Sequence, residues 1–438
     1  MRGHFPCFPS NWREVGSLKP LNHQLEIPHV ADFMEGRSPA SQRVAVAIPV
    51  KNESERLLKC LTALAAQTDY RGRRLDPETF RVFIFANNCT DGSASLARSI
   101  ADRLCLPLTV TEAQLSQAEA HAGNARGSAM DMAAAWLAQN DAMTGVLLTT
   151  DADSRVPPLW IATNLSAIEV GADAVLGRIQ LDEEGDLLPG ALHRRGRLES
   201  EYEALLTQLF AILDPVAFNP WPHHATISGA SLAVTREVYL RAGGLPRVPL
   251  GEDKALVAEL FRRDAKVRYS PDIVVTTSGR LVGRAPGGVA DTLRLRCAEA
   301  KATCDEMLEP YRVAIRRAKW RGRVRSLHRL GLSGRDLEWV EALEIPARHA
   351  RRIGNCATFG AAWSGIEAAS PLLARRPLTP AELPDQISGA RRALRRIGKN
   401  DLSPPQDVES EVRVSVVAVD EHGRTHDLDE EIGGLVAS

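Results

Sequence analysis

Strand-like and helix-like stretches alternate through the first 150 residues of this 438-residue chain, and this alternation is its strongest constraint on fold. The strand-like stretches are short and mostly apolar, as expected for strands covered on both faces. They span residues 44–48, 81–85, 108–110 and 146–150. The helix-like stretches between them span residues 55–67, 93–104 and 123–140. This order predicts a mostly parallel sheet with right-handed crossovers, flanked by helices.

Two common phosphate-binding motifs are missing from this pattern. Pro49-Val-Lys-Asn-Glu53 stands after the first strand, where a G-x-G-x-x-G sequence would indicate an ordinary dinucleotide-binding fold. No G-x-x-x-x-G-K-[ST] sequence occurs, which excludes a P-loop. The nucleotide site, if there is one, must be built differently.

Composition narrows the remaining classes of protein. The net charge of −1 provides no basic field for nucleic acid. Seven cysteines, odd in number and without a C-x-x-C pair, disfavour a disulfide framework or a zinc site. No apolar run approaches the ~18 residues of a membrane span, and the N-terminus lacks the apolar core of a signal peptide. We therefore predict a cytoplasmic protein, with peripheral membrane contact left open.

Two aspartates, Asp151 and Asp153, follow the fourth strand-like stretch. Open α/β sheets bind their ligands beyond the carboxyl ends of strands, and side chains two residues apart project to the same side of an extended chain. Carboxylate oxygens there suit Mg²⁺ or Mn²⁺ that also holds a diphosphate. The alternative interpretation is a strand end followed by a solvated turn.

Four motifs follow one another in a specific order. The first is Ala47-Ile-Pro-Val-Lys-Asn-Glu53, and the last is Asp151-Ala-Asp153, a DXD motif. Between them lie Asn87-Asn-Cys-Thr-Asp-Gly-Ser93 and Gly123-Asn-Ala-Arg126. By these motifs the chain, between about residues 43 and 285, resembles a family 2 glycosyltransferase of the GT-A fold, a nucleotide-diphospho-sugar transferase with a mostly parallel Rossmann-like sheet.

The resemblance implies that residues at the strand ends bind a UDP- or GDP-sugar. Many relatives carry an acidic residue that contacts uracil where this chain has Ala86 and Asn87, so the base stays open. Structural interpretations also exist, because Asn52 and Glu53 suit a helix start and Arg126 suits a solvated helix surface. The implied donor-binding residues are Pro49, Asn52, Glu53, Asn87, Asp91, Arg126, Asp151, Ala152 and Asp153, with Asp151 and Asp153 as metal ligands.

A later loop adds two arginines to this set. Arg280 and Arg284 lie among glycines, which suggests a mobile loop that closes over a diphosphate or holds an anionic group of the acceptor. Relatives often place a histidine near here as a third metal ligand, and none occurs between His224 and His328. The Q-x-x-R-W motif of processive synthases is also missing, so we expect a non-processive enzyme.

The middle of the chain is predicted to bind the acceptor and carry the base. Gly251-Glu-Asp-Lys-Ala-Leu256 resembles the acceptor half of family 2 enzymes, which points to Asp253 as the catalytic base with Glu252 in support. The alternative is a pair of helix-capping acids without chemistry. The preceding loop, Asn219-Pro-Trp-Pro-His-His-Ala225, is predicted to contact the acceptor sugar, and the alternative is a proline-stiffened surface turn. The predicted acceptor residues are Trp221, His223, His224, Ser228 and Gly229.

Residues 289–438 lie outside the resemblance. We predict an N-terminal extension over residues 1–42, a GT-A domain over 43–288, and a mainly helical C-terminal extension ending in a β-hairpin. Basic helical sequence is expected over 291–325, further helices over 347–374 and 380–397, and a strand over 411–419 before a turn at His422-Gly423. A helical cap or homodimer interface is the simpler interpretation, and a platform for an anionic acceptor or membrane is the alternative.

These observations predict a metal-dependent glycosyltransferase of the hexosyltransferase type (EC 2.4), inverting and non-processive. It would move a sugar to a hydroxyl of a small-molecule, lipid or glycan acceptor, with retention left open. One rival is a nucleotidyltransferase, whose G-x-x-x-R-x-x-P-x-x-K loop is replaced here by Pro49-Val-Lys-Asn-Glu53. The other is a catalytically silent sugar-nucleotide-binding scaffold.

Overall fold

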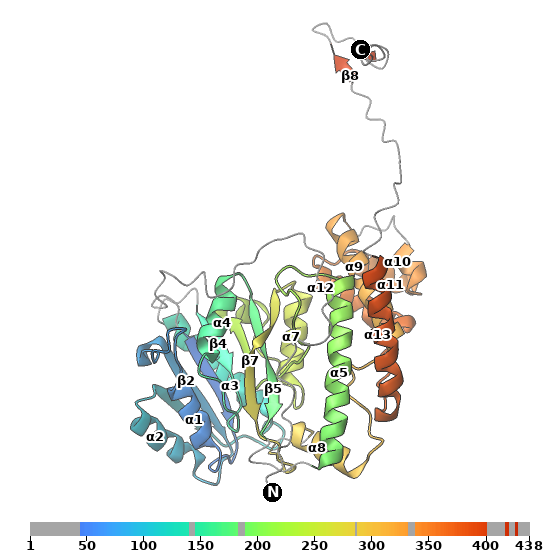
Figure 1. Cartoon of the computed structure of the whole chain (residues 1–438). Coiled ribbons are helices and arrows are strands. Elements are labelled where there is room, and N and C mark those ends of the chain that lie inside the picture. Colours follow the sequence, from blue (N-terminus) through green and yellow to red (C-terminus); the bar gives the residue numbers. More distant parts are fainter. Residues whose placement is uncertain are drawn as a thin grey trace, which may run out of the picture.

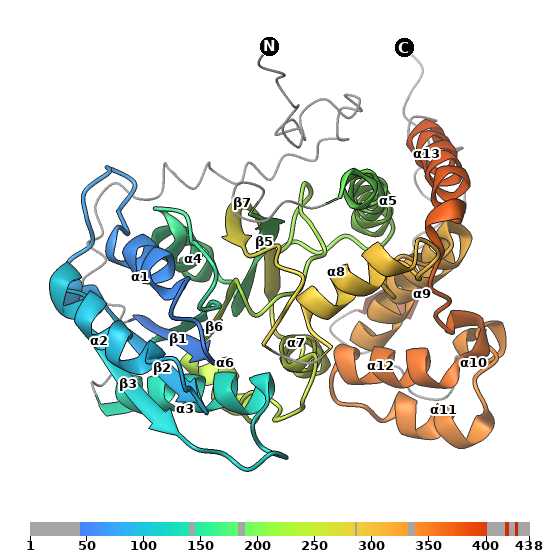
Figure 2. The same ribbon diagram turned by 90° about the horizontal axis from the view of Figure 1, so that it is seen from below.

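The computed structural model describes residues 44–139, 145–182, 189–284, 287–331, 338–400, 417–419 and 425–427. An α/β sandwich forms one side of the molecule and a group of helices forms the other, as Figures 1 and 2 show in two perpendicular views. Among these residues, no helix is both long enough and apolar enough to cross a bilayer.

A seven-stranded sheet in the order β3-β2-β1-β4-β6-β5-β7 organises the α/β part. Strands β1, β2, β3 and β4 pair in parallel, and so do β5 and β7, whereas β6 runs antiparallel between β4 and β5. The predicted mixed α/β class with a mostly parallel sheet is confirmed. The strands are β1 (Val44–Val50), β2 (Phe80–Asn87), β3 (Leu108–Ala113), β4 (Val146–Thr149), β5 (Ala174–Leu181), β6 (Leu232–Thr235) and β7 (Val267–Thr277).

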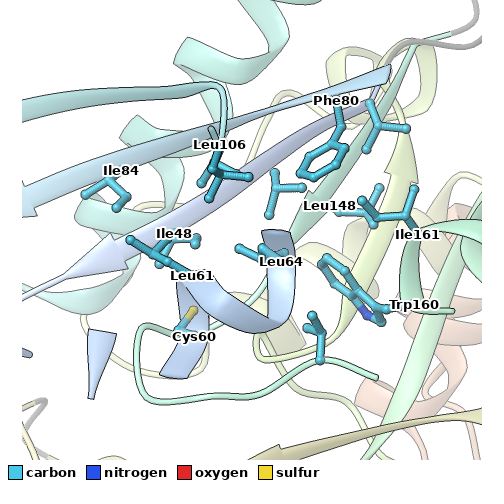
Figure 3. Close-up of a cluster of buried hydrophobic side chains, with 14 of the residues drawn as sticks. Ile48, Cys60, Leu61, Leu64, Phe80, Ile84, Leu106, Leu148, Trp160 and Ile161 are labelled. Atoms are coloured by element: carbon cyan, nitrogen blue, oxygen red, sulfur yellow. The ribbon is translucent and has the colours of Figure 1, made fainter. Parts of the chain in front are cut away.

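Helices cover both faces of this sheet because side chains along each strand alternate between two cores. In β1, Val44, Val46 and Ile48 enter one core, and Ala45 and Ala47 enter the other. Figure 3 shows the first core, where α1 and α4 place Leu61, Leu64 and Trp160 against the strands. This face carries α1 (Leu57–Ala65), α2 (Ser93–Leu104) and α4 (Trp160–Glu169), and the other carries α3 (Ala122–Gln139), α6 (Arg236–Arg241) and α7 (Glu252–Arg262).

The remaining helices form two further cores. Helix α5 (Gly190–Leu213) packs with α9 (Tyr311–Arg329) and α13 (Leu383–Asn400) in one. The other core is shared by α9, α10 (Glu338–Ala342), α11 (Ala347–Gly354) and α12 (Phe359–Ala369). Single 3₁₀ turns occur at Pro77–Thr79, Pro371–Leu373 and Pro380–Glu382, and α8 (Val289–Ala298) lies against one end of α5 (Figure 1).

Strand β7 is continuous over Val267–Thr277, because a register shift beside Gly177 and Arg178 of β5 accommodates Pro271 and Asp272. The structure also bears on two expectations for the C-terminal part of the chain. The basic stretch 291–325 is two helices, since Pro310 has no N–H to continue a helix and stands at the start of α9. The C-terminal hairpin is seen as β8 (Val417–Val419) paired with β9 (Thr425–Asp427), and its turn and residues 411–416 lie outside the described residues.

The helical part is locked to α7 at the end opposite its acidic pair. Asp264 follows α7 and accepts hydrogen bonds from the N–H groups of Phe359 and Gly360 at the start of α12, at 2.9 and 2.7 Å. Thr358 Oγ1 donates to the carbonyl of Arg262 at 2.6 Å. The C-terminal helices therefore fix the position of a helix whose other end reaches the candidate site.

Candidate active site

The carboxyl ends of β1, β2 and β4 meet at one edge of the sheet, and the start of α7 faces them. This arrangement follows from the parallel pairing of the three strands. It gathers most of the predicted site residues, and two arginines tie them together.

Arg126 of α3 lies at the centre of the first group. Its guanidinium donates to Asp151 Oδ1 at 2.7 Å, to Glu252 Oε1 at 2.9 Å, to Thr149 Oγ1 at 2.9 Å and to the carbonyl of Gly229 at 3.0 Å. The side chain is 7% exposed. Although burial opposes the charge, Asp151 and Glu252 raise the pKa of Arg126. The surface arginine considered from sequence is thus a buried arginine with four partners.

Asp153, Glu53 and Arg280 form the second group. Arg280 Nη2 lies 3.1 Å from Asp153 Oδ2, and Nη1 donates to Glu53 Oε2 at 2.7 Å. Thr277 Oγ1 lies 3.4 Å from the other oxygen of Asp153. Burial raises the pKa of Asp153 to about 6, the charges of Asp151 and Glu53 add to this shift, and Arg280 opposes it. Negative charge around Asp153 therefore exceeds what Arg280 neutralises.

A polar layer supports the end of β1. Asp91 accepts from the N–H of Ser54 at 3.0 Å and from Ser93 Oγ at 2.6 Å, and Ser93 Oγ accepts from the N–H of Glu53 at 2.9 Å. Although burial raises it, these hydrogen bonds from Ser93 and Ser54 hold the pKa of Asp91 well below its usual range. Asp91 is thus committed to holding Glu53 in place.

The remaining predicted donor residues lie at the same edge. Asn52 has a positive φ of 54°, and its Oδ1 accepts from the N–H of Thr90 at 2.8 Å. Arg284 Nε donates to the Asn52 carbonyl at 3.0 Å. Asn87, at the end of β2, is 2% exposed, and its Oδ1 has no hydrogen-bond partner among the described residues. Pro49 lies inside β1 and Ala152 is buried, so both can act only through their backbone.

Asp253, the predicted base, stands at the start of α7. Its Oδ2 accepts from the N–H of Gly229 at 2.8 Å, and its Oδ1 accepts from the N–H of Lys254 at 2.7 Å. A Cβ on Gly229 would lie 2.4 Å from Arg126 Cζ, which explains the glycine. Gly229 therefore bridges Arg126 and Asp253. Ser228 Oγ accepts from the N–H of Ala230 at 3.2 Å.

The Trp-Pro-His-His loop divides into an accessible and a buried half. Trp221 is 37% exposed, and its ring centroid lies 5.8 Å from that of His223. His224 is 4% exposed, with Nε2 3.2 Å from the carbonyls of Leu176 and Ser270. Its Nδ1 accepts from a backbone N–H at 3.1 Å. His224 therefore anchors the loop and has no ring nitrogen left for an acceptor, whereas Trp221 and His223 lie nearer the surface.

The carboxylates at the strand ends are the candidate ligands of a divalent cation. The described residues contain no group of three His, Cys, Asp or Glu arranged to hold a metal. Asp151 and Asp153 offer carboxylate oxygens, and burial together with the charges of Asp151 and Glu53 raises the pKa of Asp153. Mg²⁺ commonly uses one or two carboxylates and completes its shell with phosphate oxygens and water. The donor set fits such an ion when a diphosphate is also present.

A cavity of about 230 Å³ opens beside Asp153. It lies between the start of α1 and the ends of β5 and β7, and both cationic and anionic side chains border it. Its lining residues are Glu55, Arg56, Lys59, Asp153, Arg155, Asp182 and Ser278.

Sequence reasoning missed the partners that hold the site residues. Thr149, Ser93 and Thr277 each contact a predicted site residue and were not singled out. One signal was available for Arg126. It lies four residues before buried Met130 on α3, which places its side chain on the sheet-facing side of the helix.

Comparison with known proteins gives a family and a set of similar structures. Residues 45–225 match the model of the family described as "Glycosyl transferase family 2". No protein with curated annotation matches the chain. TarS 1–349 from S. aureus, solved with UDP-GlcNAc, is 13% identical over 88% of this chain and 99% of that chain, with a TM-score of 0.41.

The mannosyltransferase PcManGT from Pyrobaculum calidifontis is a second similar structure. It was solved with GDP-Man and Mn²⁺, and it is 17% identical over 85% of this chain and 88% of that chain, with a TM-score of 0.39. Both TM-scores lie below 0.5, so the ligands of these two structures are not assigned to this chain.

Proposed function

Because residues 45–225 belong to glycosyl transferase family 2, we propose that this glycosyltransferase moves a sugar from a nucleotide-diphosphate donor to an acceptor hydroxyl. One observation carries the proposal. Asp151, after β4, and Asp253, at the start of α7, belong to one hydrogen-bonded cluster, Asp151–Arg126–Gly229–Asp253. The proposed metal ligand Asp151 and the proposed base Asp253 are thus joined through Arg126 and Gly229, which suits action on the same glycosidic bond of the donor.

The donor would lie along the ends of β1, β2 and β4. Asn87 Oδ1 is a buried acceptor with no partner among the residues that the structure describes, which suits an N–H of the base. Arg280 and Arg284 already lie against Glu53 and Asn52, so a diphosphate arriving there would find two guanidinium groups within reach. UDP and GDP both remain candidates.

Asp151 and Asp153 would hold Mg²⁺ or Mn²⁺ together with the diphosphate. When bound, such an ion neutralises the charge that develops on the leaving diphosphate. Arg280 would then exchange its contact with Asp153 for the diphosphate oxygens. The cavity beside Asp153 offers Arg56, Lys59 and Arg155 to the same anionic group.

Asp253 is the proposed base. Its carboxylate accepts hydrogen bonds from two backbone N–H groups at the start of α7, where the helix dipole presents its positive end. Asp253 would take the proton of the acceptor hydroxyl as that oxygen bonds to the anomeric carbon and the bond to the diphosphate breaks. Attack from the opposite face gives inversion. Glu252 is paired with Arg126 and therefore supports the site without acting as the base.

Trp221 and His223 are the proposed acceptor contacts from the loop, with Ser228 and the Gly229 backbone beside Asp253. An exposed indole packs well against a sugar ring. We also propose that residues 43–288 form the catalytic domain and that the enzyme is non-processive.

Thermal unfolding with UDP, GDP, CDP and ADP, with and without Mn²⁺, tests the proposal. A nucleotide at 100 times its Kd should stabilise the protein by about 2.7 kcal/mol. The shift should require Mn²⁺, occur with one base, and vanish in Asp153→Ala. Asp102→Ala removes an exposed aspartate from α2 and should keep the shift. No shift with any nucleotide would refute a nucleotide site at these strand ends.

A further inference from the structure

The guanidinium of Arg126 lies between the proposed metal site and the start of α7, which carries the proposed base. The guanidinium touches Asp151, a proposed metal ligand, and Glu252, which precedes the proposed base. Both ion pairs are short, at 2.7 and 2.9 Å, and the exposed fractions of Arg126 and Glu252 are 7% and 8%. Water therefore screens the contact with Glu252 poorly. Asp151 and Glu252 compete for the same guanidinium group, so a change at one carboxylate alters the contact of Arg126 with the other.

We infer that Arg126 couples cation binding at Asp151 to the placement of Asp253. This inference rests on the proposed function. A divalent cation at Asp151 competes with Arg126 for that carboxylate. Once Asp151 is shared with the cation, Arg126 is held more fully by Glu252 and by the carbonyl of Gly229.

Gly229 transmits this change to the base. Its carbonyl accepts from Arg126 at 3.0 Å, and its N–H donates to Asp253 Oδ2 at 2.8 Å. Both bonds belong to one residue, so a firmer hold on the carbonyl limits rotation of the segment that positions Asp253. The absence of a Cβ is what lets the guanidinium lie against this backbone. Arg126 is thus a positioning residue, and the base is set only after the donor and its cation are bound.

The coupling has a consequence that does not require an acceptor. Glu252 holds part of the charge of Arg126, so its removal should leave Arg126 bound more tightly to Asp151. Cation binding at Asp151 should then weaken even though Glu252 is not a metal ligand. Coupling between two sites is reciprocal, so a change at Glu252 must alter the affinity for the cation as much as the cation alters the interactions of Glu252.

Isothermal titration with Mn²⁺ alone, repeated with Mn²⁺ and UDP, measures this effect. Glu252→Gln should raise the Kd for Mn²⁺ about fivefold to tenfold, within the usual range for two coupled sites. Glu259→Gln is the matched control, because Glu259 is an acid of the same helix whose ion pairs are with Arg262 and Arg263, and it should change the Kd less than twofold. A Kd for Glu252→Gln equal to that of the wild type would overturn the inference.

A double-mutant cycle shows whether Arg126 is the carrier. Arg126→Lys keeps the charge but loses the planar fork that reaches both carboxylates. In that background, Glu252→Gln should change the Kd less than twofold. An equal change in both backgrounds would mean that the effect does not pass through Arg126. If Glu252→Gln does not fold by circular dichroism, Glu252→Asp replaces it, with about a threefold change expected and no change overturning the inference.

Asp151→Asn separates the two proposals. Mn²⁺ binding in the wild type that Asp151→Asn abolishes supports the metal site, whatever Glu252→Gln does. A wild type without such binding refutes both the metal site and the coupling. Binding that is indifferent to Glu252 refutes the coupling alone.

Discussion

His224 should make the folded protein sensitive to mild acid. Its imidazole is held neutral by contacts on both nitrogens, because Nε2 must donate to the two carbonyls and Nδ1 must accept from Thr226. Burial, followed by the charge of Arg178, lowers the pKa of His224 to about 3. A histidine in the unfolded chain titrates near ~6.5. Between these values the unfolded chain binds a proton that the folded protein does not bind.

The sign and size follow from this difference. Stability falls as pH decreases from about 6.5 toward 3, because the unfolded state takes up the extra proton. At about 1.36 kcal/mol per pH unit, the loss through His224 at pH 5 is roughly 2 kcal/mol. His224→Gln retains an N–H donor and removes the titration, so this part of the pH dependence should disappear.

Urea unfolding at pH 7.5 and pH 5.0, for wild type and His224→Gln, measures the effect. The wild type should lose about 2 kcal/mol more than the variant between the two pH values. Other titrating groups are common to both proteins and cancel in the difference. Equal losses in the two proteins would show that the His224 ring is charged or solvated in the folded state, and the structural account of the loop would then be refuted.

Four further substitutions test the packing of the helical part. Gly360→Ala would place a Cβ 1.7 Å from the carbonyl oxygen of Phe261, so a loss of several degrees in Tm is expected. At Gly196, within α5, a Cβ would meet open space, so Gly196→Ala should stabilise the protein by about 0.5–1 kcal/mol. Arg317→Met leaves Glu309 buried without its partner, which should cost about 3–5 kcal/mol in urea unfolding, whereas adding Glu309→Leu should restore part of that loss.

Much of the fold could be predicted because its strands are short, apolar and followed by polar turns. The helix predicted over residues 93–104 is α2 as found, and the parallel part of the sheet follows from the alternation of strands and helices. The position of β6 between β4 and β5 could not be read in the same way. Its neighbours depend on pairing between segments about 60–90 residues apart, and periodicity contains no such information.

The candidate site shows the same division. Asp151 and Asp153 were found because they end a recognisable strand. The partner of Arg126 lies 126 residues away in Glu252, and that of Arg280 lies 227 residues away in Glu53. Composition and spacing show that such charges exist, but only the fold decides which of them meet.

Helix α5 belongs by sequence to the α/β region and by packing to the C-terminal helices. Tyr202, Leu205 and Leu209 of α5 are buried in a core to which Leu308, Leu383 and Ile387 contribute. A chain ended near residue 288 would leave that apolar stripe facing water, and it would also free the far end of α7. The C-terminal helices and the α/β part therefore form one packed unit, and a protein that exchanged these helices for others would have to supply a new surface for α5.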